Sequence, residues 1–232
     1  MKHALAIFKK QLKDTTKNKA VLIQFIMFPI MTLIMNNAIQ ISGMPDNFFV
    51  LLFAAMYIGM APLTAISAII AEEKEQNTLR VLLMSNVRPA AYFAGIGSYV
   101  WIICLLGSAV ICFAGTYTPK ERLFFMLTMS TGILVSLLLG AAIGAFSKTQ
   151  MMATSLTVPI MIFFSFLPMI SLFNDTVAKV AKYTYSEQIR LALSKIGDPH
   201  VSGESFCIIA ANMLLFAGLF AFACKESFSA DT

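Results

Sequence analysis

The sequence predicts an all-α, polytopic membrane protein with six transmembrane helices. Of its 232 residues, 58% are hydrophobic and only 12% are charged, whereas soluble domains carry about 25% charged residues. The charged residues are concentrated between long apolar runs. This composition excludes a soluble globular protein and a disordered chain. It also makes the net charge of +5 a feature of membrane topology rather than of nucleic-acid binding.

Six uncharged stretches are each at least 20 residues long, about the length that a helix needs to cross a bilayer. Lipid leaves no partner for a backbone polar group, so each stretch must be a helix or part of a closed barrel. Barrel strands alternate in hydrophobicity, whereas these runs are apolar on every face. The six stretches are Ala20–Pro45, Asn47–Ala71, Pro89–Pro119, Leu123–Ser147, Thr149–Asn174 and Ser205–Cys224. The first stretch is longer than the apolar region of a signal peptide, so we expect it to form a helix that is not cleaved.

The distribution of lysine and arginine predicts the orientation, because these residues collect on the cytoplasmic side of membrane proteins. With the N-terminus inside, eleven of the 17 lysines and arginines lie in cytoplasmic segments and six lie outside. Four of those six fall in the single segment 174–204, which weakens the contrast. The distribution predicts that both termini are cytoplasmic.

Residues 1–19 are predicted to form a unit of their own, ahead of the six-helix domain 20–232. Leu5, Phe8 and Leu12 recur at helical spacing, and lysines occupy many of the remaining positions. This pattern predicts an amphipathic connecting helix on the anionic inner surface of the membrane. The alternative is a plain basic tail.

The cytoplasmic segment 71–89 predicts a second short amphipathic helix. Three glutamates stand at its start, where acidic residues favour a helix N-terminus. Leucines then recur at i, i+3 and i+4 on one helical face, and Pro89 stops the pattern. A solvated loop is the alternative, but it leaves the leucine face without a role. A protein partner accounts for that face better.

Two further features concern the packing of the helices. Segment 174–204 is too charged to span and predicts one or two short helices packed on the outer mouth of the bundle. Gly140 and Gly144 form a GxxxG pattern on the fourth apolar run, which is typical of close contact between membrane helices.

No motif for catalysis or metal binding is present. The only histidines are His3 and His200, and the four cysteines lie within apolar runs. There is no GxxxxGK[ST] loop, so the chain does not bind ATP in that way. The apolar runs carry no buried carboxylate of the kind that an ion-coupled transporter needs. Any uphill transport must therefore draw its energy from elsewhere, and an intramembrane enzyme is disfavoured.

The segment EEKEQNTLRVLLMSNVRPAAYFAG at 72–95 resembles the E-E-K-E-x-G-T-L-x-x-L-L pattern of the membrane subunits of ABC-2-type exporters. The order of the other segments resembles that family along nearly the whole chain. Asn77 stands where the family usually has glycine. Asparagine tolerates the left-handed conformation better than most residues, so the turn survives.

This resemblance implies a permease subunit that moves a hydrophobic or amphipathic solute outward, such as a drug, an antimicrobial peptide or a lipid-linked molecule. ATP and Mg²⁺ would bind a separate ABC ATPase, and a second permease subunit, identical or related, would complete the pathway. The chain itself would need no cofactor and no metal. The resemblance also implies a multi-pass protein of a bacterial plasma membrane. A non-transporting scaffold or sensor that anchors a cytoplasmic partner is the alternative function.

The resemblance also implies roles for particular residues. The residues expected to couple to the ATPase are Glu72, Glu73, Glu75, Thr78, Leu79, Leu82 and Leu83. Spans 2 and 5 tend to line the pathway in this family, and the candidates there are Met56, Tyr57, Thr64, Met161, Phe163, Phe164 and Phe166.

We expect the substitution Asn77→Gly to leave function intact, because glycine adopts the left-handed conformation at least as readily as asparagine. Transport and ATPase turnover of the variant, measured beside the wild type, test this. A large loss of either would mean that the Asn77 side chain does more than permit the turn.

Overall fold

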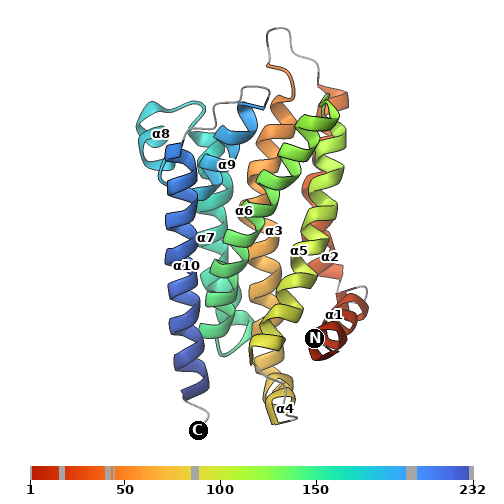
Figure 1. Ribbon diagram of the computed structural model, residues 1–232, viewed down its shortest axis with the longest axis vertical. Helices are drawn as coiled ribbons and strands as arrows, with labels where there is room; N and C mark the ends of the chain where they lie inside the picture. The colour runs from red at the N-terminus through yellow and green to blue at the C-terminus, as the bar shows by residue number, and fades with distance from the viewer. Residues whose placement is uncertain are drawn as a thin grey trace.

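The computed structural model describes residues 2–15, 19–39, 43, 45–84, 89–196 and 203–229. Over these ranges the chain forms helices joined by short turns and contains no strand, as predicted (Figure 1). The long helices run side by side along the longest axis of the molecule. They are α2 (Lys19–Ala38), α3 (Phe48–Glu75), α5 (Pro89–Ala114), α6 (Pro119–Phe146), α7 (Gln150–Ile170) and α10 (Gly203–Ser229).

Each long helix coincides with one of the six uncharged runs. Among the described residues, five of them are long and apolar enough to cross a membrane, namely α3, α5, α6, α7 and α10. The apolar part of α2, Leu22–Ala38, is shorter than these five. The chain is therefore a multi-pass membrane protein with five candidate spans, and the sixth span stays a prediction.

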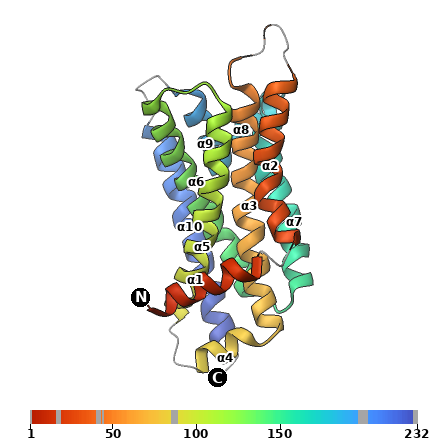
Figure 2. The same ribbon diagram turned by 90° about the vertical axis from the view of Figure 1, so that its right-hand side faces the viewer.

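The short helices lie at the two ends of the bundle. Helices α1 (Lys2–Thr15) and α4 (Thr78–Met84) occupy one end, and α8 (Asp175–Ala181) and α9 (Tyr185–Ser194) occupy the other (Figure 1). Helix α1 runs across the bundle rather than along it (Figure 2). We name the two ends the α1/α4 end and the α8/α9 end. The predicted helical segments 1–19 and 174–204 are thus confirmed as helical within the described residues.

Helix α3 is the centre of the bundle. It packs against α2, α5, α6, α7 and α9. In its most apolar 18-residue stretch 83% of the residues are buried, compared with 11% in the corresponding stretch of α10. In both ribbon views α3 stands between other long helices, with α5 and α7 on opposite sides of it (Figures 1 and 2). Contacts with α3 therefore position α2, α5, α6, α7 and α9, whereas α1 packs mainly on α5 and α10 mainly on α6.

Glycines allow α6 and α7 to approach the backbone of α3. A Cβ atom on Gly140 would collide with the carbonyl oxygen of Leu63 and lie 2.9 Å from its Cα. A Cβ on Gly144 would lie 2.9 Å from the Ser67 carbonyl oxygen. On α3 itself, a Cβ on Gly59 would meet the α7 backbone at 2.7 Å. The predicted role of the GxxxG pattern in close helix packing is confirmed.

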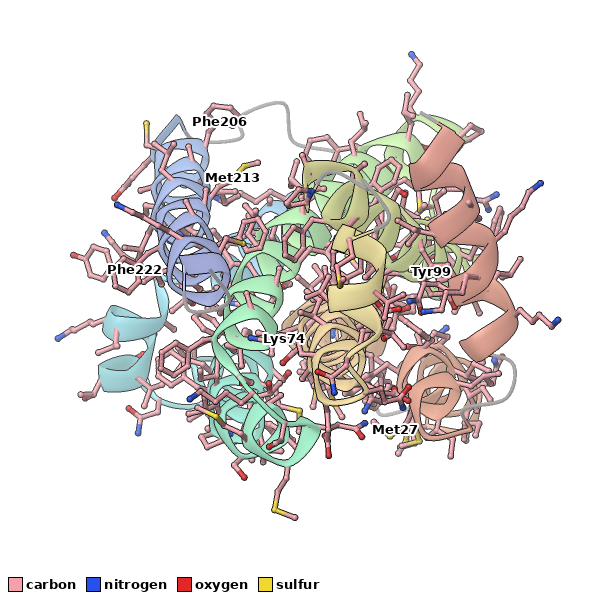
Figure 3. All side chains as sticks on the ribbon, turned by 90° about the horizontal axis from the view of Figure 1, so that it is seen from below. Met27, Lys74, Tyr99, Phe206, Met213 and Phe222 are labelled. Carbon is pink, nitrogen blue, oxygen red and sulfur yellow. The ribbon has the colours of Figure 1, made fainter. Side chains whose placement is uncertain are left out.

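The outer surface of the bundle is apolar over most of its height. Leu214 and Phe222 on α10 are 75% and 66% exposed, and Ile23 on α2 is 59% exposed. Such a continuous apolar surface is found on proteins that face lipid rather than water. The labelled side chains Phe206, Met213 and Phe222 point outward from α10 when the bundle is viewed from below (Figure 3).

We expect Gly140→Ala to destabilise the bundle by about 1–3 kcal/mol, because the added methyl group would collide with the rigid α3 backbone. Thermal unfolding of the purified chain in detergent measures this. Gly218→Ala is the matched control, since a Cβ at this α10 glycine meets no atom within 4 Å. Equal melting temperatures for the two variants would contradict the tight α3–α6 contact.

Candidate functional site

The three glutamates of the 72–95 motif end a helix rather than begin one. Helix α3 continues through the apolar run to Glu75, which corrects the prediction that the glutamates form a helix N-terminus. The helix stops because Asn77 takes a left-handed conformation with φ 57°, as expected from its place in the motif. The backbone N–H groups of Gln76 and Asn77 then bond the carbonyls of Glu72 and Lys74 at 3.0 Å each. Acidic groups at a helix C-terminus oppose its dipole, so other contacts must stabilise them.

Glu73 supplies the first such contact, to α1. Its side chain is buried, with 5% of the residue exposed. Its Oε1 accepts hydrogen bonds from Lys10 Nζ at 2.6 Å and from Gln11 Nε2 at 2.7 Å. The Tyr92 hydroxyl of α5 lies near the same carboxylate. A buried carboxylate is costly unless it is paired and hydrogen-bonded, so Glu73 fixes α1 against the bundle.

Lys74 and Glu75 make the corresponding contacts to α6 and α7. Lys74 Nζ donates to the Ala145 carbonyl at 2.5 Å, near the C-terminus of α6. Glu75 Oε2 accepts from the Gln150 backbone N–H at 2.7 Å, at the first residue of α7. Both contacts are electrostatically favourable, because cations stabilise helix C-termini and anions stabilise helix N-termini. Lys74 lies near the middle of the bundle in the view from below (Figure 3).

We call Glu73, Lys74 and Glu75 the α3 clamp. Three consecutive side chains project about 100° apart around a helix, so they reach three different neighbours. The α3 clamp joins the end of α3 to α1, α6 and α7. Glu72, by contrast, accepts a local hydrogen bond from the Gln76 side chain at 3.3 Å. This end of α3 is thus bonded to three other helices.

Helix α1 packs on the bundle through Phe8 of the predicted apolar face and through residues beside that face. Ile7 and Gln11 are the residues buried against the bundle, and Phe8 packs edge-to-face on Tyr99 of α5 with centroids 5.6 Å apart. Leu12 is 46% exposed, and the side chain of Leu5 lies outside the described residues. The reason is that the Glu73 carboxylate draws the Lys10 and Gln11 side of the helix inward.

Helix α4 presents apolar side chains that the leucine pattern did not identify. Leu79 is buried, and Thr78 donates from its hydroxyl to the Glu73 carbonyl at 3.0 Å, which attaches α4 to α3. Val81 and Met84 are 62% and 81% exposed. Leu82 and Leu83 belong to α4, but their side chains lie outside the described residues. The only sequence signal for Val81 and Met84 is their place in the same short helix.

The pathway candidates divide into buried and exposed groups. Met56, Tyr57 and Thr64 of α3 are buried within this chain, and Tyr57 lies against Gly107 of α5. On α7, Met161 and Phe164 are half-buried, and Phe164 stacks at a tilt on Tyr185. Phe163 and Phe166 are 47% and 41% exposed. Only these last two face outward over a large part of their surface.

Polar side chains in the spans bond between helices. The Thr64 hydroxyl donates to Gln24 of α2 at 2.9 Å, and the Ser67 and Thr157 hydroxyls are 2.9 Å apart between α3 and α7. These bonds satisfy polar groups at a depth where lipid would leave them without partners.

The α8/α9 end contains a second polar cluster, carried by α9. Ser136 of α6 donates to the Ile58 carbonyl at 2.6 Å, so the Tyr185 hydroxyl, 2.7 Å from Ser136, is the donor to it. Burial raises the pKa of Tyr185, which keeps that hydroxyl protonated. Arg190 donates twice to Glu187, at 2.9 and 2.6 Å, and both side chains are largely buried. Helix α9 is therefore inserted among the long helices, not merely laid upon them.

Within the described ranges, no group of three or more His, Cys, Asp or Glu side chains is arranged to hold a metal ion. The polar groups at both ends bond helices to one another. At the α1/α4 end these contacts include the ion pair Lys10–Glu73 and the hydrogen bonds that join α3 to α1, α6 and α7.

Apolar helices of this length define a membrane component. A family comparison agrees with this class: the family described as ABC-2 family transporter protein matches residues 2–224. The chain belongs to the ABC-2 transporter family, as its resemblance implied. This membership supports a permease role and implies an ABC ATPase as partner. A comparison with curated proteins gives no match.

We expect Glu73→Ala to release α1, because it leaves the buried Gln11 amide without its acceptor at a cost of about 1–3 kcal/mol. Hydrogen exchange of the α1 amides should then accelerate about tenfold or more, since about 1.4 kcal/mol corresponds to a factor of ten. Exchange in α5 and α6 should change little. Glu72→Ala is the control, because its bond to Gln76 is local. Equal protection of α1 in both variants would show that Glu73 does not hold it.

Proposed function

We propose that this chain is the permease subunit of an ATP-driven exporter and that its α1/α4 end faces the cytoplasm. A separate ABC ATPase docks on α4, and a second permease subunit, identical or related, completes the transport pathway. ATP and Mg²⁺ bind the ATPase, so the permease contributes motion rather than catalysis. The cargo is a hydrophobic or amphipathic solute that moves outward.

The observation that carries this proposal is the exposed α4 joined to the α3 clamp. Met84 is 81% exposed, the largest value among the described apolar side chains of α4, and Val81 lies on the same short helix. An exposed apolar helix at a charged, water-facing end favours burial in a protein groove. The bond from Thr78 to the Glu73 carbonyl attaches α4 directly to the clamp.

The mechanism follows from the same contacts. When the ATPase pair closes on ATP, α4 moves with it and pulls on the end of α3. The α3 clamp transmits this pull to α1 through Glu73, to α6 through Lys74 and to α7 through Glu75. Helices packed with close backbone contacts move as rigid bodies, because tight cores do not deform continuously.

The cargo class is supported by the surface that the bundle presents. The outward-facing side chains along α7 include Phe163 and Phe166, and they carry no charge. A strongly ionic cargo would need fixed counter-charges at this depth. An apolar or amphipathic molecule needs only apolar surface and a few polar groups.

Docking is tested with the double variant Val81→Ser and Met84→Ser. The chain is co-expressed with its candidate ATPase, purified through a tag on the permease and assayed for ATP hydrolysis in lipid. We expect the double variant to retain less ATPase and to lose most of the stimulated turnover, because the apolar anchors are removed.

Phe173→Ser is the matched control, since Phe173 is 76% exposed but lies beyond α7 at the opposite end. Full retention of ATPase and of turnover by the α4 variant would refute docking on α4. Purification of the wild-type chain without any ATPase, at every nucleotide condition, would favour the scaffold or sensor function instead.

A further inference from the structure

An open groove lies beside the first half of α7, next to the α3 clamp. Its volume is about 820 Å³, which falls within the range of ligand sites of about 300–1,000 Å³. It is lined by Glu75, Gln150, Met151, Thr154, Ser155, Val158 and Pro159. The groove therefore starts at the end of α3 and continues along the exposed face of the first half of α7.

The polar lining is rich in hydrogen-bond acceptors. Glu75 is the one ionisable side chain among the lining residues. The ammonium group of the adjacent Lys74 bonds the Ala145 carbonyl of α6. The hydroxyls of Thr154 and Ser155 donate to carbonyls of their own helix, both at 2.9 Å. Their lone pairs are left to accept bonds from a ligand. An ammonium group, which has only donors, complements a carboxylate and two such hydroxyls.

The rest of the lining suits an apolar tail. Met151, Val158 and Pro159 form the remaining wall, and Met151 is 81% exposed. The exposed face of α7 continues one and two turns beyond the groove through Ile162 and Phe166, which are 47% and 41% exposed. The acceptor groups thus stand at the cytoplasmic end of a continuous apolar track.

We propose that this groove is the cytoplasmic entry site for an amphiphile with a protonated amine, whose ammonium group binds Glu75. This inference rests on the proposed export function and specifies its substrate class. The apolar part of the molecule lies along α7, with its head at the cytoplasmic end. Because Glu75 also bonds the first residue of α7, an ammonium bound there contacts the same clamp that the ATPase moves.

The test measures binding to the purified permease alone, in nanodiscs of zwitterionic lipid at neutral pH. The probes are a dansyl-labelled dodecylammonium and its neutral alcohol analogue of equal chain length. We expect the wild type to bind the ammonium about tenfold more tightly than the alcohol, because hydrogen bonds between charged groups are stronger than neutral ones and a tenfold preference corresponds to about 1.4 kcal/mol. Glu75→Gln should reduce this preference to less than about twofold.

Glu75→Gln keeps an oxygen that accepts from the Gln150 N–H, so the start of α7 is preserved. Glu121→Gln is a closely matched control, because the Glu121 carboxylate accepts from the Thr118 N–H at 2.7 Å at the start of α6. It removes the same charge from the opposite end of the bundle. The control should keep the tenfold preference, and melting curves should show both variants folded.

Three results would overturn the proposal. The first is equal affinity of the wild type for the two probes. The second is an unchanged preference in Glu75→Gln. The third is cross-linking between two copies through Ser155→Cys with no probe bound, which would make the groove an interface between permease subunits. Since the assay contains no ATPase, these results do not depend on α4 docking, which its own variants test separately.

Discussion

The close approach of α3 to α6 and α7 is the contact on which the rest of the structure depends. Gly59, Gly140 and Gly144 remove the side chains that would hold these backbones apart. In lipid, helices gain little from hydrophobic burial against one another, so close van der Waals contact and interhelical hydrogen bonds hold the bundle together. Because α3 is surrounded by its neighbours, a movement of this one helix necessarily affects all of them.

The low polarity of the bilayer confines charge to the ends of the helices. In this chain the charged side chains at the end of α3 join it to neighbouring helices. Glu73, Lys74 and Glu75 follow directly on a buried apolar helix, and each bonds a different neighbour. The same short segment also carries α4 through the turn at Asn77. The proposed attachment to the ATPase, the proposed coupling contacts and the proposed site for the cargo head therefore lie close together at this end of α3.

At the α8/α9 end, a segment that carries charged side chains is packed into the bundle. Helix α9 buries Glu187 together with Arg190, so neither charge is left alone in a medium of low polarity. Tyr185 continues the hydrogen-bonded chain through Ser136 to the α3 backbone at Ile58. Helix α3 is thus fixed by polar contacts at two levels, at its C-terminal end through the clamp and at Ile58, within its first half, through Ser136 and α9.

The sequence by itself determined the helical class, the apolar runs and the helices at both ends, because these follow from local composition and from the demands of lipid. It also identified the GxxxG contact and the family motif. The left-handed turn at Asn77 was implied by the resemblance to the family motif, in which that position is usually glycine. Only the tertiary structure decided which way each side chain faces. Glu73 is buried while Glu75 is exposed, Leu12 faces outward, and Val81 and Met84 rather than Leu79 are exposed on α4. Helical spacing places residues on a common face, but it cannot identify the neighbour that covers that face, since this depends on residues distant in the chain.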